Sequence, residues 1–171
     1  IDPITQYEIA DQIKKLRSRG APGQDSITNL CLKRLTPSAI PILASIFNAS
    51  LTLGHVPAIW KRAIVRMIPK PMKDHYAANY RPISLLNTLS KLLEHLILGR
   101  MQFWIGSNGL LSTTNVGFES SGKLRILRIV QSGLTAFNRN EKLGAIFVDI
   151  EKAFDRVWHN GLLFKLNNLG I

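Results

Sequence analysis

The sequence predicts a mixed fold of α-helices and a few short β-strands. Apolar residues recur at intervals of three and four in four separate stretches, which is the spacing of one helix face. Two other stretches have the composition of strands, and a polar link separates them. With 46% hydrophobic residues, the chain has the composition of a folded protein rather than a disordered basic tail.

The first expected helix covers residues 5–17, where Ile9, Ile13 and Leu16 lie at helical spacing. The breaker sequence Gly-Ala-Pro-Gly follows at residues 20–23. Glycine and proline interrupt regular structure, so we expect a loop there.

A second helical pattern opens at Pro37 or Ser38 and closes at Gly54 and Pro57. Its apolar residues are expected on one side, where they are Ile42, Leu43, Ile46, Phe47 and Leu51. We therefore predict a core helix in this stretch.

Residues 61–69 and 80–86 are two extended runs joined by the polar link 73–79. In the first run Ile64, Arg66 and Ile68 alternate with Ala63, Val65 and Met67. Two such runs around a polar link predict an antiparallel hairpin.

The third expected helix has the most regular apolar pattern in the chain. Its apolar stripe consists of Leu85, Leu89, Leu92, Leu93, Leu96 and Ile97, before Met101, Phe103 and Trp104. We expect this stripe to pack in the core rather than to take part in catalysis or binding. Residues 106–121 are rich in Gly, Ser, Thr and Asn and read as a loop. Residues 124–137 return to helical spacing.

The charge is strongly positive, with 22 Lys and Arg against 11 Asp and Glu and a pI near 10.2. Nucleic acid is the polyanion that this charge favours, because the cations are spread along the chain; an anionic membrane surface also fits. No apolar run approaches the roughly 18 residues of a membrane span, so we expect no membrane partner. The single Cys31 suits a reducing, intracellular compartment and is expected to be a small buried residue.

The apolar run 143–148 ends at Asp149 and contains no proline, so it predicts a buried strand that delivers this carboxylate at its end. A carboxylate in that position can bind a divalent metal. Equally, Asp149 can cap a helix over residues 151–158, and the nonapeptide 147–155 alone does not separate the two interpretations. The four histidines show no metal-ligand spacing.

Several short motifs carry a resemblance to a known family. In order they are APGQD at 21–25, PAIWK at 57–61, IPKP at 68–71, NYRPISL at 79–85, SKLLE at 90–94 and FVDIEKAFDRVWH at 147–159. Together they resemble the N-terminal part of the reverse transcriptase domain of a non-LTR (LINE-type, jockey-like) retrotransposon, over nearly the whole chain.

The resemblance implies an α+β fold made of the fingers and the start of a polymerase palm. Residues 1–142 would be mainly fingers and connecting helices, and residues 143–171 the first palm strand and helix. The implied function is an RNA-directed DNA polymerase that transfers nucleotides to a primer 3′-hydroxyl. Its partners would be an RNA template, a DNA primer, dNTP and the rest of the same polyprotein.

The resemblance also assigns site residues. Asp149 would be the catalytic metal ligand and the backbone carbonyl of Ile150 would assist it, with two Mg²⁺ ions in the complete enzyme. Phe154 would stack under the sugar of the incoming dNTP, and Lys70 and Arg81 would bind its triphosphate. From composition alone, Phe154 is an ordinary core residue and the two cations are solvated surface groups.

The sequence departs from the family at three points. The second palm motif, an aromatic-x-Asp-Asp turn, is absent, so we expect these 171 residues alone to be inactive. Glu119 stands where relatives carry a cation, and Ser26 stands where they favour glycine. These departures leave open a noncatalytic nucleic-acid-binding remnant of a decayed or domesticated element. A group II intron maturase-like protein is a second alternative, because the resemblance to fingers and palm extends to those enzymes.

Overall fold

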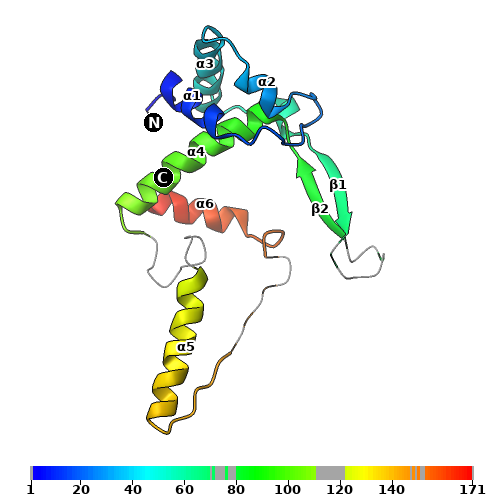
Figure 1. Cartoon of the computed structure of the whole chain (residues 1–171). Coiled ribbons are helices and arrows are strands. Elements are labelled where there is room, and N and C mark those ends of the chain that lie inside the picture. The colour runs from blue at the N-terminus through cyan, green and yellow to red at the C-terminus, as the bar shows by residue number, and fades with distance from the viewer. Residues whose placement is uncertain are drawn as a thin grey trace. The chain divides into compact units, whose positions relative to one another are not determined.

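The computed structural model describes residues 2–69, 71, 76, 80–110, 122–146, 148, 150 and 153–170. It divides into two compact units, Ile1–Phe103 and Trp104–Ile171, and each is described by itself. The regular secondary structure of the described residues consists of helices and one antiparallel strand pair, which agrees with the α+β expectation (Figure 1). Among these residues no helix is both long and apolar enough to cross a membrane.

Helix α1 (Gln6–Lys15) confirms the first predicted helix and begins at a capping box. The Thr5 hydroxyl accepts a hydrogen bond from the Glu8 amide at 3.2 Å, and the Glu8 carboxylate accepts from the Thr5 amide at 2.8 Å. These bonds satisfy amide groups that have no partner within the first helical turn. Ile9 and Ile13 are buried on the inner side of the helix.

Helix α2 (Asn29–Lys33) lies between the predicted loop at 20–23 and the second predicted helix, where no element was predicted. Thr28 caps it by accepting a hydrogen bond from the Cys31 amide at 3.4 Å. A helix of five residues is too short to show apolar periodicity, which is why the pattern missed it. Leu32 is its buried residue, whereas Cys31 is exposed. The expectation that Cys31 is buried is therefore wrong.

Helix α3 (Ala39–Thr52) confirms the second predicted helix, and its core-facing side agrees only in part with the predicted one. Ala44 and Ser50 are buried with Leu43 and Phe47, while Ile42 is 62% exposed. A 3₁₀ turn, η1 (Ala58–Lys61), follows and brings the Trp60 ring edge-on to Phe47, with 5.9 Å between ring centroids. Edge-to-face pairs add about 0.5–1.5 kcal/mol to the effect of burial.

Helix α4 (Thr88–Ser107) supplies the leucine stripe, and the stripe packs as expected. Leu92, Leu93 and Leu96 are buried in the same core cluster as residues of α1, α2 and α3, whereas Leu85 belongs to the preceding strand. The core cluster of this unit contains Ile4, Ile9, Ile13, Leu32, Leu43, Ala44, Phe47, Trp60, Leu92, Leu93 and Leu96.

Strands β1 (Ile64–Pro69) and β2 (Tyr80–Leu85) pair antiparallel, which confirms the predicted hairpin. The register sets Ile64 opposite Leu85 and Pro69 opposite Tyr80. Most of its side chains are exposed, so the hairpin stands out from the core as a two-stranded arm (Figure 1).

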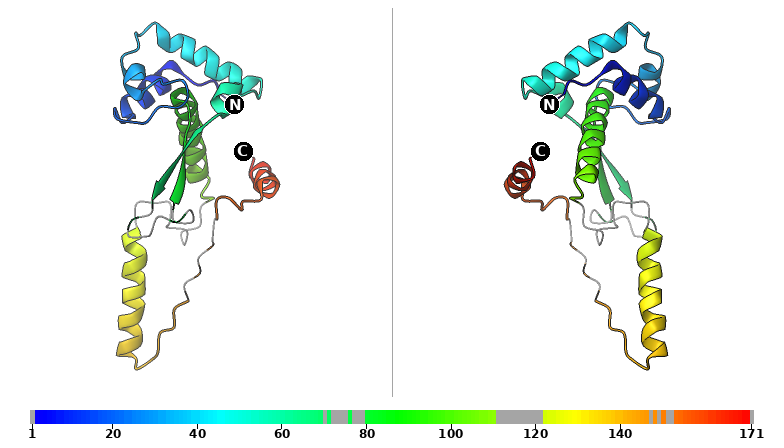
Figure 2. Two further views of the ribbon diagram at one scale, coloured as in Figure 1. Left: turned by 90° about the vertical axis from the view of Figure 1, so that its right-hand side faces the viewer. Right: turned by 90° about the vertical axis from the view of Figure 1, so that its left-hand side faces the viewer.

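In the second unit, α5 (Gly122–Asn138) confirms the helix predicted at residues 124–137, and α6 (His159–Asn168) follows. The predicted strand at 143–148 is not formed by its described residues, which are coil with Ile146 92% and Val148 85% exposed (Figure 2). An extended segment makes ladder hydrogen bonds only beside a second strand, and the described residues pair only β1 with β2. The helix considered at 151–158 is also wrong, because residues 153–156 form a turn and α6 starts at His159.

Candidate functional site

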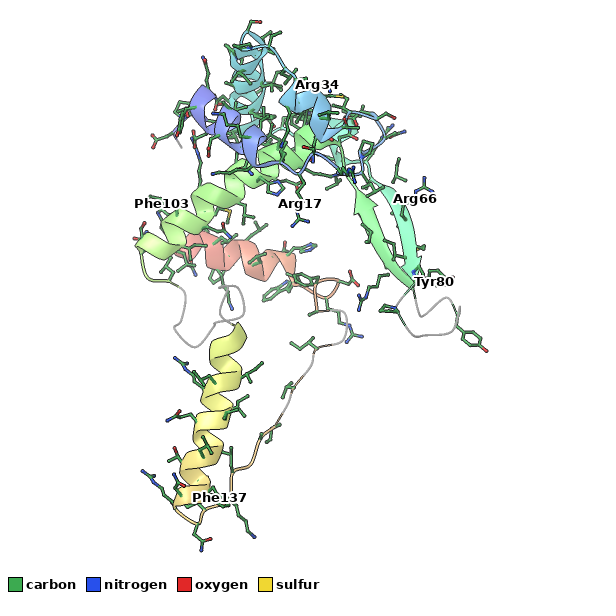
Figure 3. The ribbon with its side chains drawn as sticks, in the orientation of Figure 1. Arg17, Arg34, Arg66, Tyr80, Phe103 and Phe137 are labelled. Carbon is green, nitrogen blue, oxygen red and sulfur yellow. The ribbon has the colours of Figure 1, made fainter. Side chains whose placement is uncertain are left out.

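The hairpin presents two arginines on one face. Arg66 lies opposite Ile83, and Arg81 lies opposite Ile68. Alternate residues of a strand share a face, and directly opposed residues do too, so the two arginines are diagonal neighbours. Diagonal neighbours are about 7–8 Å apart at their backbones, which lets two long cationic side chains contact one anionic group. Both side chains are exposed, and Figure 3 shows Arg66 extending away from the strands.

Of the two cations expected to bind a triphosphate, the structure describes one. Arg81 lies on β2, as predicted, while Lys70 lies outside the described residues. Arg66 is a site residue that the sequence argument did not single out. The alternating pattern of residues 63–68 already placed it on the face of Ile64 and Ile68.

The base of the hairpin is held by Asn87 and the first residues of α4, which bond to η1 and to the loop between α1 and α2. The side-chain Nδ2 of Asn87 donates to the Ile59 carbonyl at 3.1 Å, and the Thr88 hydroxyl donates to the Ile27 carbonyl. Lys91 Nζ donates to the Ala21 carbonyl at 3.0 Å. Asn87 and Thr88 are almost fully buried, so these bonds lie in a low-dielectric setting where their geometry is held firmly.

Gly23 explains why the 21–25 motif contains a glycine at its third position. A Cβ atom on Gly23 would lie 2.3 Å from Asn87 Oδ1 and 2.5 Å from the backbone nitrogen of Asn87. Contacts that short do not occur, so the loop can approach the start of α4 only with glycine here. The loop, η1 and the hairpin base are thereby joined at one point.

A partly buried ion pair closes the other end of this unit. Arg100 contacts the Glu8 carboxylate through two nitrogens, Nε and Nη2, each at 2.9 Å, and it also donates to the carbonyls of Asp2 and Pro3. The hydrogen bond from Arg100 lowers the pKa of the Glu8 carboxyl to about 2. Asn48 bonds both the amide and the carbonyl of Ile4, at 2.6 and 2.9 Å. The N-terminal segment is therefore bound to α3 and α4.

The Cys31 thiol is hydrogen-bonded to Thr28, and no general base or metal-binding side chain is recorded beside it among the described residues. The Thr28 hydroxyl lies 3.3 Å from its sulfur, and this hydrogen bond lowers the pKa of the Cys31 thiol. A slightly acidic, exposed thiol can be alkylated or oxidised. Nothing around it indicates a catalytic role.

The residues expected to form the metal and sugar site fall in the second unit. Asp149 lies outside the described residues. Ile150 is 65% exposed in a coil segment, and its carbonyl makes no hydrogen bond to another described residue. Phe154 is 86% exposed in the turn 153–156, which contradicts the alternative that it is a core residue of this unit. No three His, Cys, Asp or Glu of the described ranges gather as a metal site.

Comparison with known proteins gives a consistent family. The family model for reverse transcriptase (RNA-dependent DNA polymerase) matches residues 68–171. A probable RNA-directed DNA polymerase from transposon BS of Drosophila melanogaster is 40% identical over 99% of the chain. The corresponding protein from transposon X-element of the same species is 38% identical over 97% of the chain.

The RNA-directed DNA polymerase from mobile element jockey of Drosophila funebris is 37% identical over 98% of the chain. The chain spans 19% of the length of each of these three relatives. The family model covers well over half of the chain, including β2, α4 and the segment around Asp149. The chain therefore belongs to the reverse transcriptase (RNA-dependent DNA polymerase) family, among the jockey-like non-LTR retrotransposon proteins.

Proposed function

We propose that this chain forms the fingers and the first palm segment of an RNA-directed DNA polymerase. That polymerase extends a DNA primer on an RNA template, using dNTP. In this assignment residues 1–142 are mainly fingers and residues 143–171 begin the palm. The polypeptide that the relatives carry beyond the matched fifth of their length supplies the remaining palm and the thumb.

The observation that carries the proposal is the arginine face of the hairpin, in a chain of this family. Arg66 and Arg81 share one exposed face, and Lys70 follows directly after β1. A triphosphate needs several cations at short range, and arginine can bind phosphate oxygens through two N–H groups at once. The hydrogen bonds of Asn87, Thr88 and Lys91 hold the base of the hairpin, so the cations are carried on a fixed support.

The segment around Asp149 is proposed to hold the metal. A carboxylate and a backbone carbonyl are hard oxygen donors of the kind that Mg²⁺ prefers, and the Ile150 carbonyl has no competing bond among the described residues. Two bound Mg²⁺ ions would supply activation of the primer hydroxyl and charge neutralisation at the leaving pyrophosphate. Phe154 projects from an exposed turn, where its ring can stack under a sugar.

The test is primer extension by a fusion protein in which this chain replaces the matching stretch of the Drosophila funebris jockey polymerase. With RNA template, dNTP and Mg²⁺, we expect extension. Replacing Arg66 and Arg81 together by glutamine should raise the KM for dNTP at least about tenfold, because about 1.4 kcal/mol of lost phosphate binding is a factor of ten.

The matched control replaces Lys61 and Arg62, two exposed cations just before β1, by glutamine. It removes the same charge outside the paired register, so the KM for dNTP should change by less than about threefold. Equal effects of the two pairs would reject the hairpin assignment. A fusion protein that binds RNA but fails to extend the primer would instead support the noncatalytic binding remnant.

The maturase-like alternative gains no support from the three relatives compared, which are named as transposon or mobile-element polymerases. Among the departures that favour the noncatalytic alternative, Glu119 lies outside the described residues. The primer-extension experiment separates this alternative from the polymerase without reference to Glu119.

A further inference from the structure

A second concentration of positive charge lies away from the hairpin strands. Residues 14–34 contain six Lys and Arg and a single carboxylate, that of Asp25. We define the basic loop patch as the exposed cations Arg17, Arg19 and Lys33 together with the half-buried Lys91. It involves the loop after α1, helix α2 and the start of α4.

Hydrogen bonds join the parts of the basic loop patch. The side-chain Nδ2 of Asn29 donates to the Arg17 carbonyl at 2.7 Å, and Lys33 Nζ lies 3.5 Å from the Ser18 hydroxyl. Lys91 Nζ donates to the Ala21 carbonyl at 3.0 Å. A Cβ atom on Gly20 would lie 2.7 Å from Asn29 Nδ2, so the loop packs closely on α2. The cations thus project from a fastened loop, and Figure 3 shows Arg17 extending outward from the ribbon.

No acidic side chain among the described residues neutralises these cations. The two salt bridges of the described residues are Lys15 with Asp11 at 2.6 Å and Arg100 with Glu8 at 2.9 Å. The Asp25 carboxylate instead accepts a hydrogen bond from the Ile27 amide at 3.1 Å. The positive charge of the basic loop patch is therefore available to a ligand.

The composition around these cations selects the kind of ligand. Residues 17–26 contain no large apolar side chain, and near Lys33 the exposed large apolar residues among those described are Leu30 and Leu35 alone. The patch therefore lacks the broad apolar face with which a protein inserts into a membrane surface. Residues 17–34 contain no aromatic residue that could stack on a base. Spaced cations without stacking rings suit a row of phosphates read without regard to sequence.

We propose that the basic loop patch binds the phosphodiester backbone of nucleic acid, as a contact surface separate from the arginine face of the hairpin. The proposal deepens the proposed function and rests on it for the presence of a nucleic-acid substrate. Because the contacts are to phosphate, the patch contributes affinity and salt dependence rather than base specificity.

The test uses the 171-residue chain and fluorescence anisotropy with labelled single-stranded RNA and DNA 20-mers of mixed sequence, between 50 and 300 mM salt. The variant Arg17→Gln, Arg19→Gln, Lys33→Gln leaves Lys91 and its loop contact in place. Single-stranded phosphate contacts each contribute about 0.7 to the salt slope, so the slope should fall by about 2 and the affinity at least about tenfold.

The matched control is Arg128→Gln, Arg139→Gln, Lys142→Gln, which removes three exposed cations from and after α5. Its salt slope should stay within about 0.5 of the wild type. Arg17→Lys with Arg19→Lys should keep binding, because phosphate contacts need charge. Urea unfolding of each variant verifies that the chain remains folded.

If the patch variant loses affinity for both RNA and DNA, the proposal is supported and the ligand is a phosphodiester backbone of either kind. If it loses affinity for RNA alone, the proposal is supported and the ligand is the RNA template strand. An unchanged salt slope in the patch variant, or an equal change in the control, overturns it. Arg66→Gln with Arg81→Gln is measured in parallel by dNTP KM in the fusion protein. Failure of the hairpin assignment is thereby recorded separately from failure of this inference.

Discussion

Residues 2–103 and residues 104–170 have similar kinds of helix but bury very different amounts of apolar surface. In the first region Ile9, Phe47 and Leu92 are completely buried. In the second, Ala136 is the buried hydrophobic residue among those described. Phe137 on α5 is 83% exposed (Figure 3).

The difference teaches which interactions specify each region. In the first, amphipathic helices cover one another, so burial of their apolar faces stabilises the arrangement. In the second, α5 exposes Ile126, Val130 and Leu134 at intervals of four, a face suited to packing against another element. Its helices are defined by local hydrogen bonds, while tertiary packing contributes little among the described residues.

The largest predicted effect separates the two regions by stability. Phe47→Ala should lower the free energy of unfolding of the chain by about 3–5 kcal/mol, because it empties a filled core position beside Trp60. Phe154→Ala removes an exposed ring and should change the same quantity by less than about 0.5 kcal/mol. Urea denaturation followed by tryptophan fluorescence measures both, and similar losses for the two variants would break the comparison.

A smaller effect is expected from the pH dependence of the first region. The pKa of Glu8 is lowered from 4.5 to about 2, so its ion pair with Arg100 stabilises the fold above about pH 4.5. This stabilisation is lost as pH falls toward 2, because the folded state must then accept a proton that the unfolded chain binds more readily. For a pair this exposed, the loss should be about 1 kcal/mol.

Thermal unfolding between pH 5 and 2 tests this by comparing the wild type with Glu8→Gln. The wild type should lose more stability over that interval, and the difference should disappear when Arg100→Gln is present in both. A difference that persists without Arg100 would assign the effect to the hydrogen bonds that Glu8 accepts from Thr5. Within the described residues the second region contains no salt bridge, so it should not share this dependence.

The smallest effect concerns two non-glycine residues with a left-handed backbone conformation, one in each region of the molecule. Ser26 has φ +57° and Asn140 has φ +55°. Ser26→Gly should stabilise the chain by about 0.5 kcal/mol, since relief of about 1–2 kcal/mol of backbone strain exceeds the added entropy of the unfolded chain. Asn140→Gly should have less effect, because asparagine tolerates this conformation. A larger gain at Asn140 than at Ser26 in urea denaturation would contradict the strain argument.

The sequence predicted the fold well where a single residue pattern determines an element. Period-four apolar spacing located α1, α3, α4 and α5, and alternation around a polar link located the hairpin. It failed at α2, which is too short for periodicity, and at 143–148, where an apolar run alone does not provide a partner strand. The core-facing side of α3 was predicted correctly for Leu43 and Phe47 but not for Ile42, because a helix without charged residues has no strongly polar side to orient it.

The candidate site could be predicted only in part, for a similar reason. Arg81 could be named because it lies in a family motif, while Arg66 required the strand register. The pair of Glu8 with Arg100 joins residues 92 apart in the chain, and no local sequence pattern connects two residues so far apart. The bonds from Asn87, Thr88 and Lys91 to distant carbonyls leave no sequence pattern, because any residue offers a carbonyl.

The most direct test of the account is the effect of Asp149→Asn on Mg²⁺-dependent primer extension in the fusion protein, beside Asp155→Asn as the matched control. Asp155 lies in the turn after the site, and its replacement should leave most of the extension rate. Asp149→Asn should reduce extension at least about 1,000-fold while RNA affinity changes less than about twofold, because it removes a proposed metal ligand and no proposed nucleic-acid contact. Undiminished extension by Asp149→Asn would contradict the metal assignment.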